Sequence, residues 1–295
     1  MEKIRVIYDT DIGDDIDDAY ALSLLLSSPE VQLEGVCTVH GPVERRARIA
    51  RKLLAAAGRE DVPVIVGLAG RGDTNAVPNQ GPWAGEMDVT MCARDPVKFV
   101  ADRVAATPGK IHLLAVGAQT NVGTLFRTHP QVARQLASVV VMGGSVYRGY
   151  SRADAPQAEH NIRCDPQAAR AVVQAGADLT LVPLDATMAT RLSDDQLKRI
   201  ADSKAPLAKA MTELLPLWRG GSTNNPVLHD PLAAALLIKP DLGRIREMHI
   251  EVTDEGMTEP VERGTPNAKV CLEVDAVRFF DLFLSRLTEG RTPGG

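Results

Sequence analysis

The sequence predicts an α/β protein, a single domain over residues 1–295 with a mainly parallel open sheet and flanking helices. The first observation is a series of short segments rich in β-branched residues, most of them separated by enough chain for a helix. The second is a uniform composition, 44% hydrophobic and 24% charged, with no shift that marks a domain boundary. The predicted strands are 4–8, 31–39, 62–66, 111–116, 138–142, 179–183, 245–252 and 268–274.

Helical patterns fill several of the intervals. Segments 19–28 and 44–58 carry apolar residues at helical spacing, 165–176 opens with an Asp–Pro pair, and 275–287 is strongly amphipathic. The least regular segments are 67–92 and 214–228, and long irregular loops in a compact domain are usually functional or mobile. Because ligands of open parallel sheets bind beyond the carboxyl ends of the strands, residues that follow strands are the candidates for a site.

Charge and composition exclude several classes of partner. A net charge of −5 leaves no basic surplus for a nucleic acid or an anionic membrane. No apolar run approaches the roughly 18 residues that span a bilayer, and the N-terminus lacks the apolar core of a signal peptide. We therefore expect a cytoplasmic protein. Cys37, Cys92, Cys164 and Cys271 lie far apart in the sequence, which argues against zinc and disulfides and favours reduced thiols.

The densest chemical signal directly follows the first predicted strand. Six of the ten residues from Asp9 to Asp18 are aspartates, and the last two open the apolar helix 19–28. So many carboxylates at one strand end repel one another unless a cation compensates them, and oxygen ligands select a hard ion such as Ca²⁺ or Mg²⁺. The alternative is a solvated acidic loop with helix caps. The six are Asp9, Asp11, Asp14, Asp15, Asp17 and Asp18.

Six segments, taken together, resemble the inosine–uridine-preferring nucleoside hydrolase family nearly from end to end. They are DTDIG…DDAYAL from residue 9, VGAQTNVGTLFRTHP (116–130), VVVMGG (139–144), AEHNIRCDPQAA (158–169), HDPLAAA (229–235) and VDAVRFFDLFL (274–284). The resemblance implies the nucleoside hydrolase fold with a Rossmann-like core. It also implies hydrolysis of the N-glycosidic bond of a riboside, one tightly held Ca²⁺, and a role in nucleoside salvage. We expect a homodimer or homotetramer with a small-molecule partner.

The resemblance implies roles for the matching residues. Asp11 is similar to the residue that is both metal ligand and general base, and His229 is similar to a histidine that protonates the leaving base in some members. The other implied metal ligands are Asp18, Asp230 and the backbone carbonyl of Thr120. The implied sugar contacts are Asp17, Met142, Glu159 and Asn161.

Three departures distinguish this sequence from the family pattern. The acidic turn is two residues longer than the usual DxDPGxDDA, so Asp15 is a further candidate ligand. Two asparagines of the family are replaced, by Pro42 and by Ala153. His160 stands where the family has an aromatic residue and is a candidate substrate contact. The substrate therefore differs from an ordinary nucleoside if these positions set specificity.

The two tryptophans and two other functions complete the expectations. Trp83 and Trp218 fall in the irregular segments and are candidates for stacking on the leaving base. The DTD run also suggests a phosphatase of the haloacid dehalogenase type, although Gly13 occupies a position where that family needs Thr or Val. A nucleoside- or sugar-binding protein that has lost turnover is the non-enzymatic alternative.

Overall fold

The computed structural model describes residues 2–289; residue 1 and residues 290–295, the ends of the expected domain, lie outside the described residues. Within the described range nine strands form one sheet, in the order β3-β2-β1-β4-β5-β6-β9-β7-β8. Neighbours from β3 to β9 run parallel, whereas β7 is antiparallel to β9 and β8. The strands are β1 (Ile4–Thr10), β2 (Val31–Thr38), β3 (Val64–Ile65), β4 (Ile111–Ala115), β5 (Ser138–Met142), β6 (Leu179–Val182), β7 (Gly243–Val252), β8 (Thr258–Val261) and β9 (Ala268–Val274).

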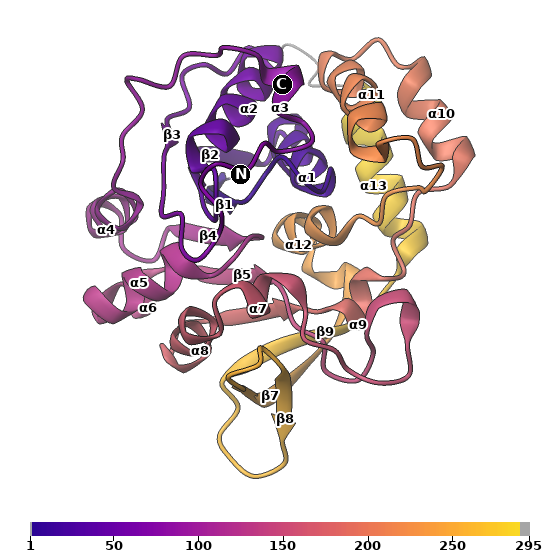
Figure 1. Ribbon diagram of the computed structural model, residues 1–295. Helices are drawn as coiled ribbons and strands as arrows, with labels where there is room; N and C mark the ends of the chain where they lie inside the picture. The colour runs from indigo at the N-terminus through magenta and orange to yellow at the C-terminus, as the bar shows by residue number, and fades with distance from the viewer. Residues whose placement is uncertain (1, 290–295) are drawn as a thin grey trace.

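Helices cover both faces of this sheet (Figure 1). Two groups of buried apolar side chains fill the two layers, one beneath α1, α2, α11, α12 and α13 and the other beneath α4, α5, α6 and α8. The helices are α1 (Asp17–Ser27), α2 (Val43–Ala56), α3 (Gly81–Ala84), α4 (Pro96–Ala106), α5 (Thr120–Thr128), α6 (Pro130–Gln135), α7 (His160–Cys164), α8 (Pro166–Gln174), α9 (Leu184–Thr187), α10 (Asp194–Asp202), α11 (Pro206–Arg219), α12 (His229–Ile238) and α13 (Ala276–Glu289), with short 3₁₀ turns at Tyr150–Arg152 and Pro240–Leu242.

The mainly parallel open sheet with flanking helices is confirmed, and the differences from prediction are local. β3 has only two residues, and β8 was not predicted because its four residues include Pro260 and follow a glycine turn. The predicted irregular segment 214–228 begins as the end of α11, which continues through Pro216. Burial of Leu207, Met211 and Leu214 against the core stabilises this helix.

The strand order places a site at the carboxyl end of β1. β1 pairs with β2 on one side and with β4 on the other. The chain therefore adds β2 and β3 toward one edge of the sheet and then β4 and β5 toward the other. Ligands of open parallel sheets bind where the strand order changes direction in this way. α1 follows β1, and every residue of α1 is buried. α1 packs against α12, which begins at His229, so the acidic turn before α1 faces the HDPLAAA segment (229–235).

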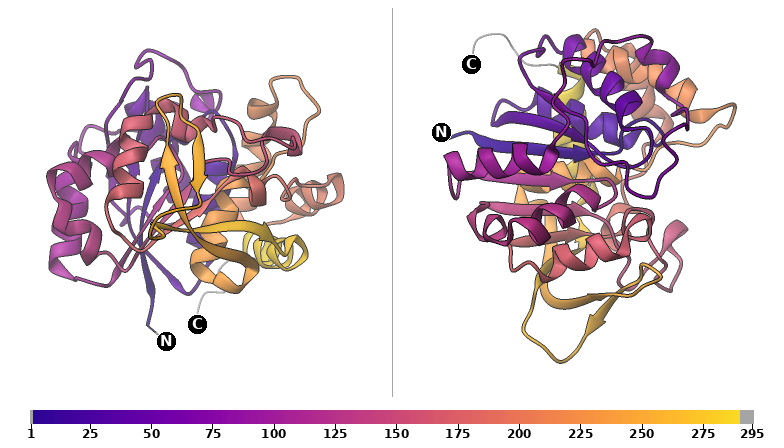
Figure 2. Two further views of the ribbon diagram at one scale, coloured as in Figure 1. Left: turned by 90° about the horizontal axis from the view of Figure 1, so that it is seen from below. Right: turned by 60° about the vertical axis from the view of Figure 1, so that its left-hand side comes forward.

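Two peripheral features complete the description. The β7–β8 hairpin extends beyond the body of the molecule, as the right view of Figure 2 shows. Within residues 2–289, no helix combines the length and apolar character needed to cross a membrane.

Candidate active site

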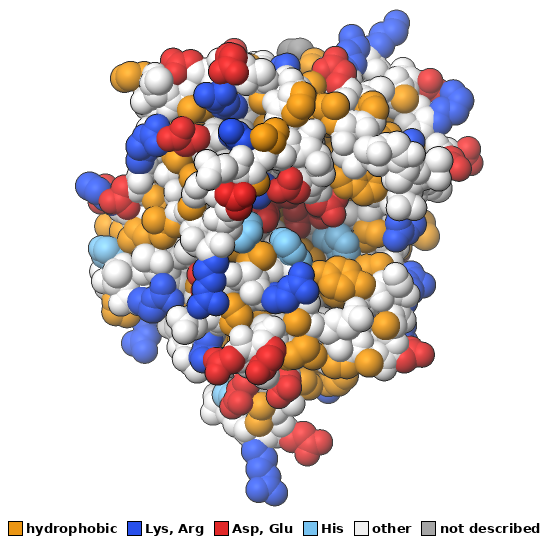
Figure 3. All heavy atoms as spheres, viewed as in Figure 1, with side chains coloured by type: hydrophobic (Ala, Val, Ile, Leu, Met, Phe, Trp, Pro, Cys, Tyr) orange, Lys and Arg blue, Asp and Glu red, His pale blue; other side chains and the backbone are white. Residues whose placement is uncertain are grey.

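A cavity of about 370 Å³ opens at the carboxyl ends of the strands. Its lining comes from the β1–α1 turn, the β2–α2 loop, the end of β5, α7, and the start of α12. In Figure 3 acidic side chains gather at the floor of this hollow, and histidine side chains border them. The cavity therefore brings together three segments that are far apart in the sequence: the acidic turn (9–18), the AEHN segment from residue 158 and the HDPLAAA segment from residue 229.

The long acidic turn has a fixed shape because several of its residues are anchored. Ile12 and Ile16 are fully buried beneath it. Gly13 has φ +133°, and a Cβ there would lie 2.8 Å from Ile49 and from Pro78. The Thr10 hydroxyl donates to the Asp18 carboxylate, which fixes the first residues of α1 relative to β1. The two extra residues of this turn thus form an ordered part of the site.

Asp17, Asp18 and Asp230 form a buried carboxylate triad. An oxygen from each lies within 4.8 Å of the others, and the Asp230 backbone N–H donates to Asp17 Oδ2 at 3.1 Å. Burial raises the pKa of all three carboxyls well above the usual range, and neighbouring aspartates act in the same direction. Three buried oxygen donors of like charge fit a hard cation, which would compensate the repulsion.

Asp11 lines the same cavity, outside the triad. A Cβ at Gly117 would lie 2.8 Å from Asp11 Oδ1, so glycine is needed to admit this carboxylate. On the other side, the guanidinium of Arg46 donates to the Asp11 backbone carbonyl. The base candidate is therefore held from two sides.

Two of the remaining proposed ligands occupy different surroundings. Asp15 lines the cavity; desolvation raises its pKa, and a hydrogen bond from the Trp218 side chain acts in the opposite direction. Thr120 is the first residue of α5, and its hydroxyl donates to Asp165 Oδ2 at 2.8 Å. Thr120 is not part of the cavity lining, so a role for its carbonyl stays a prediction.

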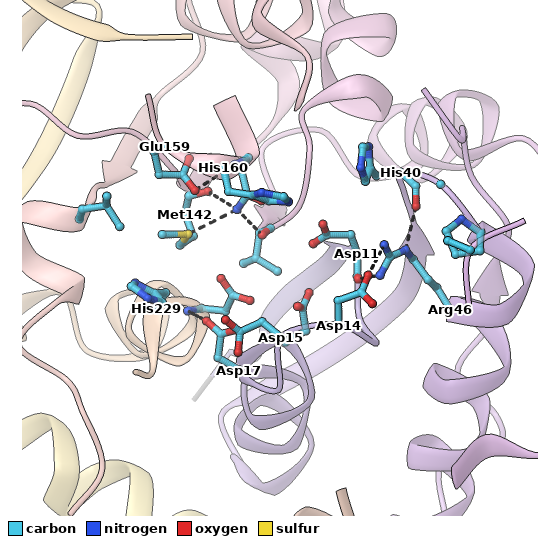
Figure 4. A pocket seen from close by; sticks show the side chains of 18 of the residues that line it. Asp11, Asp14, Asp15, Asp17, His40, Arg46, Met142, Glu159, His160 and His229 are labelled. Carbon is cyan, nitrogen blue, oxygen red and sulfur yellow. Dashed lines mark hydrogen bonds and ion pairs between the residues drawn. The ribbon is translucent and has the colours of Figure 1, made fainter. Parts of the chain in front are cut away.

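Glu159 and Met142 lie at the end of the cavity opposite Arg46 (Figure 4), and Asn161 also lines the cavity. The Glu159 carboxylate accepts hydrogen bonds from the backbone N–H groups of Gly144, Asn161 and Ile162 at 2.9–3.2 Å, and so caps α7. The Asn161 amide donates to the Val116 carbonyl at 2.7 Å. These bonds orient a carboxylate and an amide toward the cavity, as recognition of hydroxyl groups requires.

His229 lies at the triad end of the cavity, His160 lies beside Glu159 and Met142, and His40 lies on the far side of Asp11, toward Arg46 (Figure 4). His229 Nδ1 is 2.7 Å from the Thr187 hydroxyl. Burial, and then the charge of Arg191, lowers the pKa of His229 to about 4. The imidazole is therefore neutral at pH 7 before substrate binds.

The structure does not bring Trp83 into the cavity. Its indole N–H donates to Glu213 at 2.7 Å, and Lys52 lies 4.5 Å from its ring centroid. Trp83, on α3, thus packs against α2 and α11, and its predicted loop position gave no sign of these partners. Trp218 touches the site through Asp15 and is not part of the lining. Of the replaced asparagine positions, Pro42 lines the cavity and Ala153 does not.

Arg46 is a site residue that the sequence analysis missed. Its side chain is only 3% exposed and donates to the carbonyls of His40 at 2.7 Å and Ile12 at 3.1 Å, and to Asp14 Oδ2 at 2.9 Å. An available signal was its position in helix 44–58, where it falls on the apolar stripe with Ile49, Ala50 and Leu53. A charged residue on a buried face needs partners, and the acidic turn supplies them.

A mainly parallel α/β sheet with a buried cluster of acidic oxygens at the carboxyl end of its first strand is typical of an α/β enzyme with a cation site in its cleft. The chain belongs to the inosine-uridine preferring nucleoside hydrolase family, whose model matches residues 6–281. It is therefore an N-glycosyl hydrolase by family, which confirms the resemblance seen in the sequence.

Individual relatives agree with this assignment. The pyrimidine-specific ribonucleoside hydrolase RihA of Citrobacter koseri is 30% identical over 314 aligned positions, which cover 96% of this chain and 98% of the relative. The solved structure of a plant nucleoside hydrolase, PpNRh1, is 26% identical with a TM-score of 0.83 and covers 96% of this chain and 98% of its own. A purine-preferring ribonucleoside hydrolase from Gardnerella vaginalis is 27% identical with a TM-score of 0.81, over 97% and 98% of the two chains.

Proposed function

We propose that this protein hydrolyses the N-glycosidic bond of a ribonucleoside to ribose and free base, acting as one domain over residues 1–295. The observation that carries the proposal is the convergence of the Asp17–Asp18–Asp230 triad, Asp11 and His229 in one cavity. The relatives include pyrimidine-specific and purine-preferring enzymes. We therefore propose a purine or pyrimidine ribonucleoside, and not a phosphate ester, as the substrate.

Ca²⁺ is the proposed resident ion. The donor set supports this choice because it consists of carboxylate oxygens without thiolate or imidazole, and because its members are buried and like-charged. Asp18 and Asp230 would hold the ion, with Asp11, Asp15 and the Thr120 carbonyl as further ligands. When bound, Ca²⁺ would lower the pKa of water and orient the ribose diol.

The protein's own residues would divide the remaining work. Asp11 would accept a proton from the attacking water as general base. Asp17, Glu159 and Asn161 would hold the sugar hydroxyls, and Met142 would cover the sugar ring. The carboxylates together would stabilise the oxocarbenium-like charge that develops on the ribose as the bond breaks.

At the other end of the reacting bond, His229 would protonate the leaving base. Its pKa of about 4 makes it neutral in the free protein, so the substrate must raise that pKa for proton transfer. Negative charge that develops on the departing base acts in this direction. His160, exposed at the cavity mouth, would contact the base.

Replacing Asp11 tests turnover against mere binding. Asp11→Asn keeps the shape of the side chain but removes the base, so we expect hydrolysis of a nucleoside panel to fall by at least about 10²–10⁴-fold. The melting temperature should stay near the wild-type value, because Asp11 lies at the cavity surface and outside the apolar core. Asp102→Asn, which alters an exposed aspartate on α4 outside the cavity lining, is the control. Wild-type turnover in Asp11→Asn would remove it from the mechanism, and no turnover by the wild type would favour a binding protein.

A further inference from the structure

A thiol, that of Cys164, lies between two imidazoles that line the cavity, those of His160 and His40, but is not itself part of the lining. Cys164 Sγ is 3.5 Å from His160 Nε2 and 3.8 Å from His40 Nε2. His160 and Cys164 are four residues apart in α7, which places them on one face. His40 comes from the β2–α2 loop, 124 positions away from Cys164. The wide spacing of the cysteines concealed this cluster in the sequence.

The sulfur–nitrogen distances match those between two ligands of one metal ion. With metal–sulfur bonds of about 2.3 Å and metal–nitrogen bonds of about 2.0–2.1 Å, a tetrahedral ion separates sulfur from nitrogen by about 3.6 Å. Both observed distances, 3.5 and 3.8 Å, lie close to that separation. A thiolate and two imidazoles are ligands that suit soft or borderline ions such as Zn²⁺ and not Ca²⁺.

The two rings need only a small approach. Their centroids are 6.4 Å apart and their planes cross at 84°, whereas two imidazoles on one tetrahedral ion would have centroids about 5 Å apart. His160 is exposed and can turn by that amount. Binding of one ion by both imidazoles therefore requires this approach of the His160 ring toward His40.

The position of His40 is fixed by its backbone. Its φ of +65° is unusual for a residue with a side chain. Bonds from the His40 N–H to the Leu68 carbonyl at 2.9 Å and from Arg46 Nε to the His40 carbonyl at 2.7 Å hold it there. Within the described part of the chain, the buried Nδ1 of His40 has no hydrogen-bond partner. The His40 imidazole therefore has one near polar neighbour, the Cys164 sulfur, which lies 3.8 Å from Nε2.

We propose that His40, His160 and Cys164 bind a divalent cation of the zinc class, and that this cation inhibits hydrolysis. Binding forms a metal–sulfur bond and releases the thiol proton to solvent. Asp11 lies between His160 and His40 along the cavity (Figure 4), so an ion held by these histidines would lie near the general base and oppose its action. The inhibitory role rests on the proposed function, but ion binding does not.

The test uses the calcium-loaded protein. Hydrolysis of p-nitrophenyl riboside is measured against rising ZnCl₂ for the wild type, Cys164→Ser and Cys92→Ser. The zinc concentration for half-inhibition should rise by at least about 10-fold in Cys164→Ser, which loses one of three ligands. Cys92→Ser, which alters a half-buried cysteine in a different groove, should match the wild type. Equal half-inhibition in all three proteins would place zinc at the carboxylate triad and overturn the proposal.

Cobalt(II) supplies a readout that does not depend on turnover. A sulfur-to-cobalt charge-transfer band should develop in the wild type and be absent in Cys164→Ser. His40→Asn should weaken cobalt binding, because asparagine tolerates the left-handed backbone while removing the imidazole. No band in the wild type would refute the site. If the wild-type protein shows the cobalt band but hydrolyses none of the substrates, the proposed function is wrong and the metal site stands.

Discussion

Arg46→Met should both destabilise the protein and impair catalysis. The substitution keeps an apolar stem of similar length but removes the donor to three backbone carbonyls, those of Asp11, Ile12 and His40, and the partner of Asp14. Each buried acceptor left unsatisfied costs about 1–3 kcal/mol. Taking the low end for each carbonyl gives about 3 kcal/mol, a large part of the roughly 5–15 kcal/mol that stabilises a typical protein.

The corresponding fall in melting temperature is about 6–12 °C, since 1 kcal/mol shifts a protein of this size by roughly 2–4 °C. Release of Asp11 and His40 should lower kcat by about 10²-fold, the effect of a catalytic group displaced by about 1 Å. The melting temperature and kcat of Arg46→Lys should lie between those of the wild type and Arg46→Met, because a single ammonium group cannot reproduce the planar set of donors of a guanidinium.

Thermal unfolding in excess Ca²⁺ and steady-state hydrolysis are the measurements. Arg51→Met is the matched control, since Arg51 lies on the same helix but lines a separate surface groove. Wild-type melting temperature and kcat in Arg46→Met would refute the reasoning. A lowered melting temperature with unchanged kcat would limit Arg46 to a structural role.

Two further predictions concern the leaving group and the metal. His229→Ala should slow hydrolysis of natural nucleosides but spare p-nitrophenyl riboside, whose leaving group needs no proton; equal losses on both substrates would assign His229 to structure or sugar binding. Removal of Ca²⁺ by a chelator should abolish hydrolysis and lower the melting temperature. A ligand at 100 times its dissociation constant adds about 2.7 kcal/mol to the free energy of unfolding, and the chelator removes this contribution. The free energy of unfolding of the metal-free protein should also fall as the pH rises above about 4, the ordinary pKa of an aspartate. The folded triad has raised pKa values, so the unfolded chain gives up its protons first and is increasingly favoured. A melting temperature unaffected by chelator at pH 7 would contradict a resident metal.

The parts of the fold that could be predicted are those fixed by local pattern. β1 and β5 are runs of β-branched residues between polar segments, and α2 has a clear apolar stripe, so the sequence itself indicates them. β8 is stabilised mainly by its pairing with β7, and α11 persists through Pro216 because its earlier turns are buried. Such tertiary effects leave little trace in the sequence.

The same distinction applies to the site. The acidic turn is dense enough to notice alone, whereas Asp230 and His229 draw meaning only from the family resemblance. The contact of Asp17 with Asp230, the burial of Arg46 and the approach of Cys164 to His40 depend on packing between distant segments. Trp83 shows the opposite error, since a loop position suggested a ligand contact and the indole instead bonds Glu213.

The contact between Asp17 and the Asp230 backbone joins residues 213 positions apart. During synthesis, the carboxylates at the start of α1 therefore leave the ribosome long before their partner, and α1, apolar and wholly buried in the finished protein, lacks its neighbour α12 for most of that time. The nascent chain must shield this helix, by interim contacts or by a chaperone. Truncation before residue 230 should then yield chains that aggregate and that lack one carboxylate of the proposed cation site.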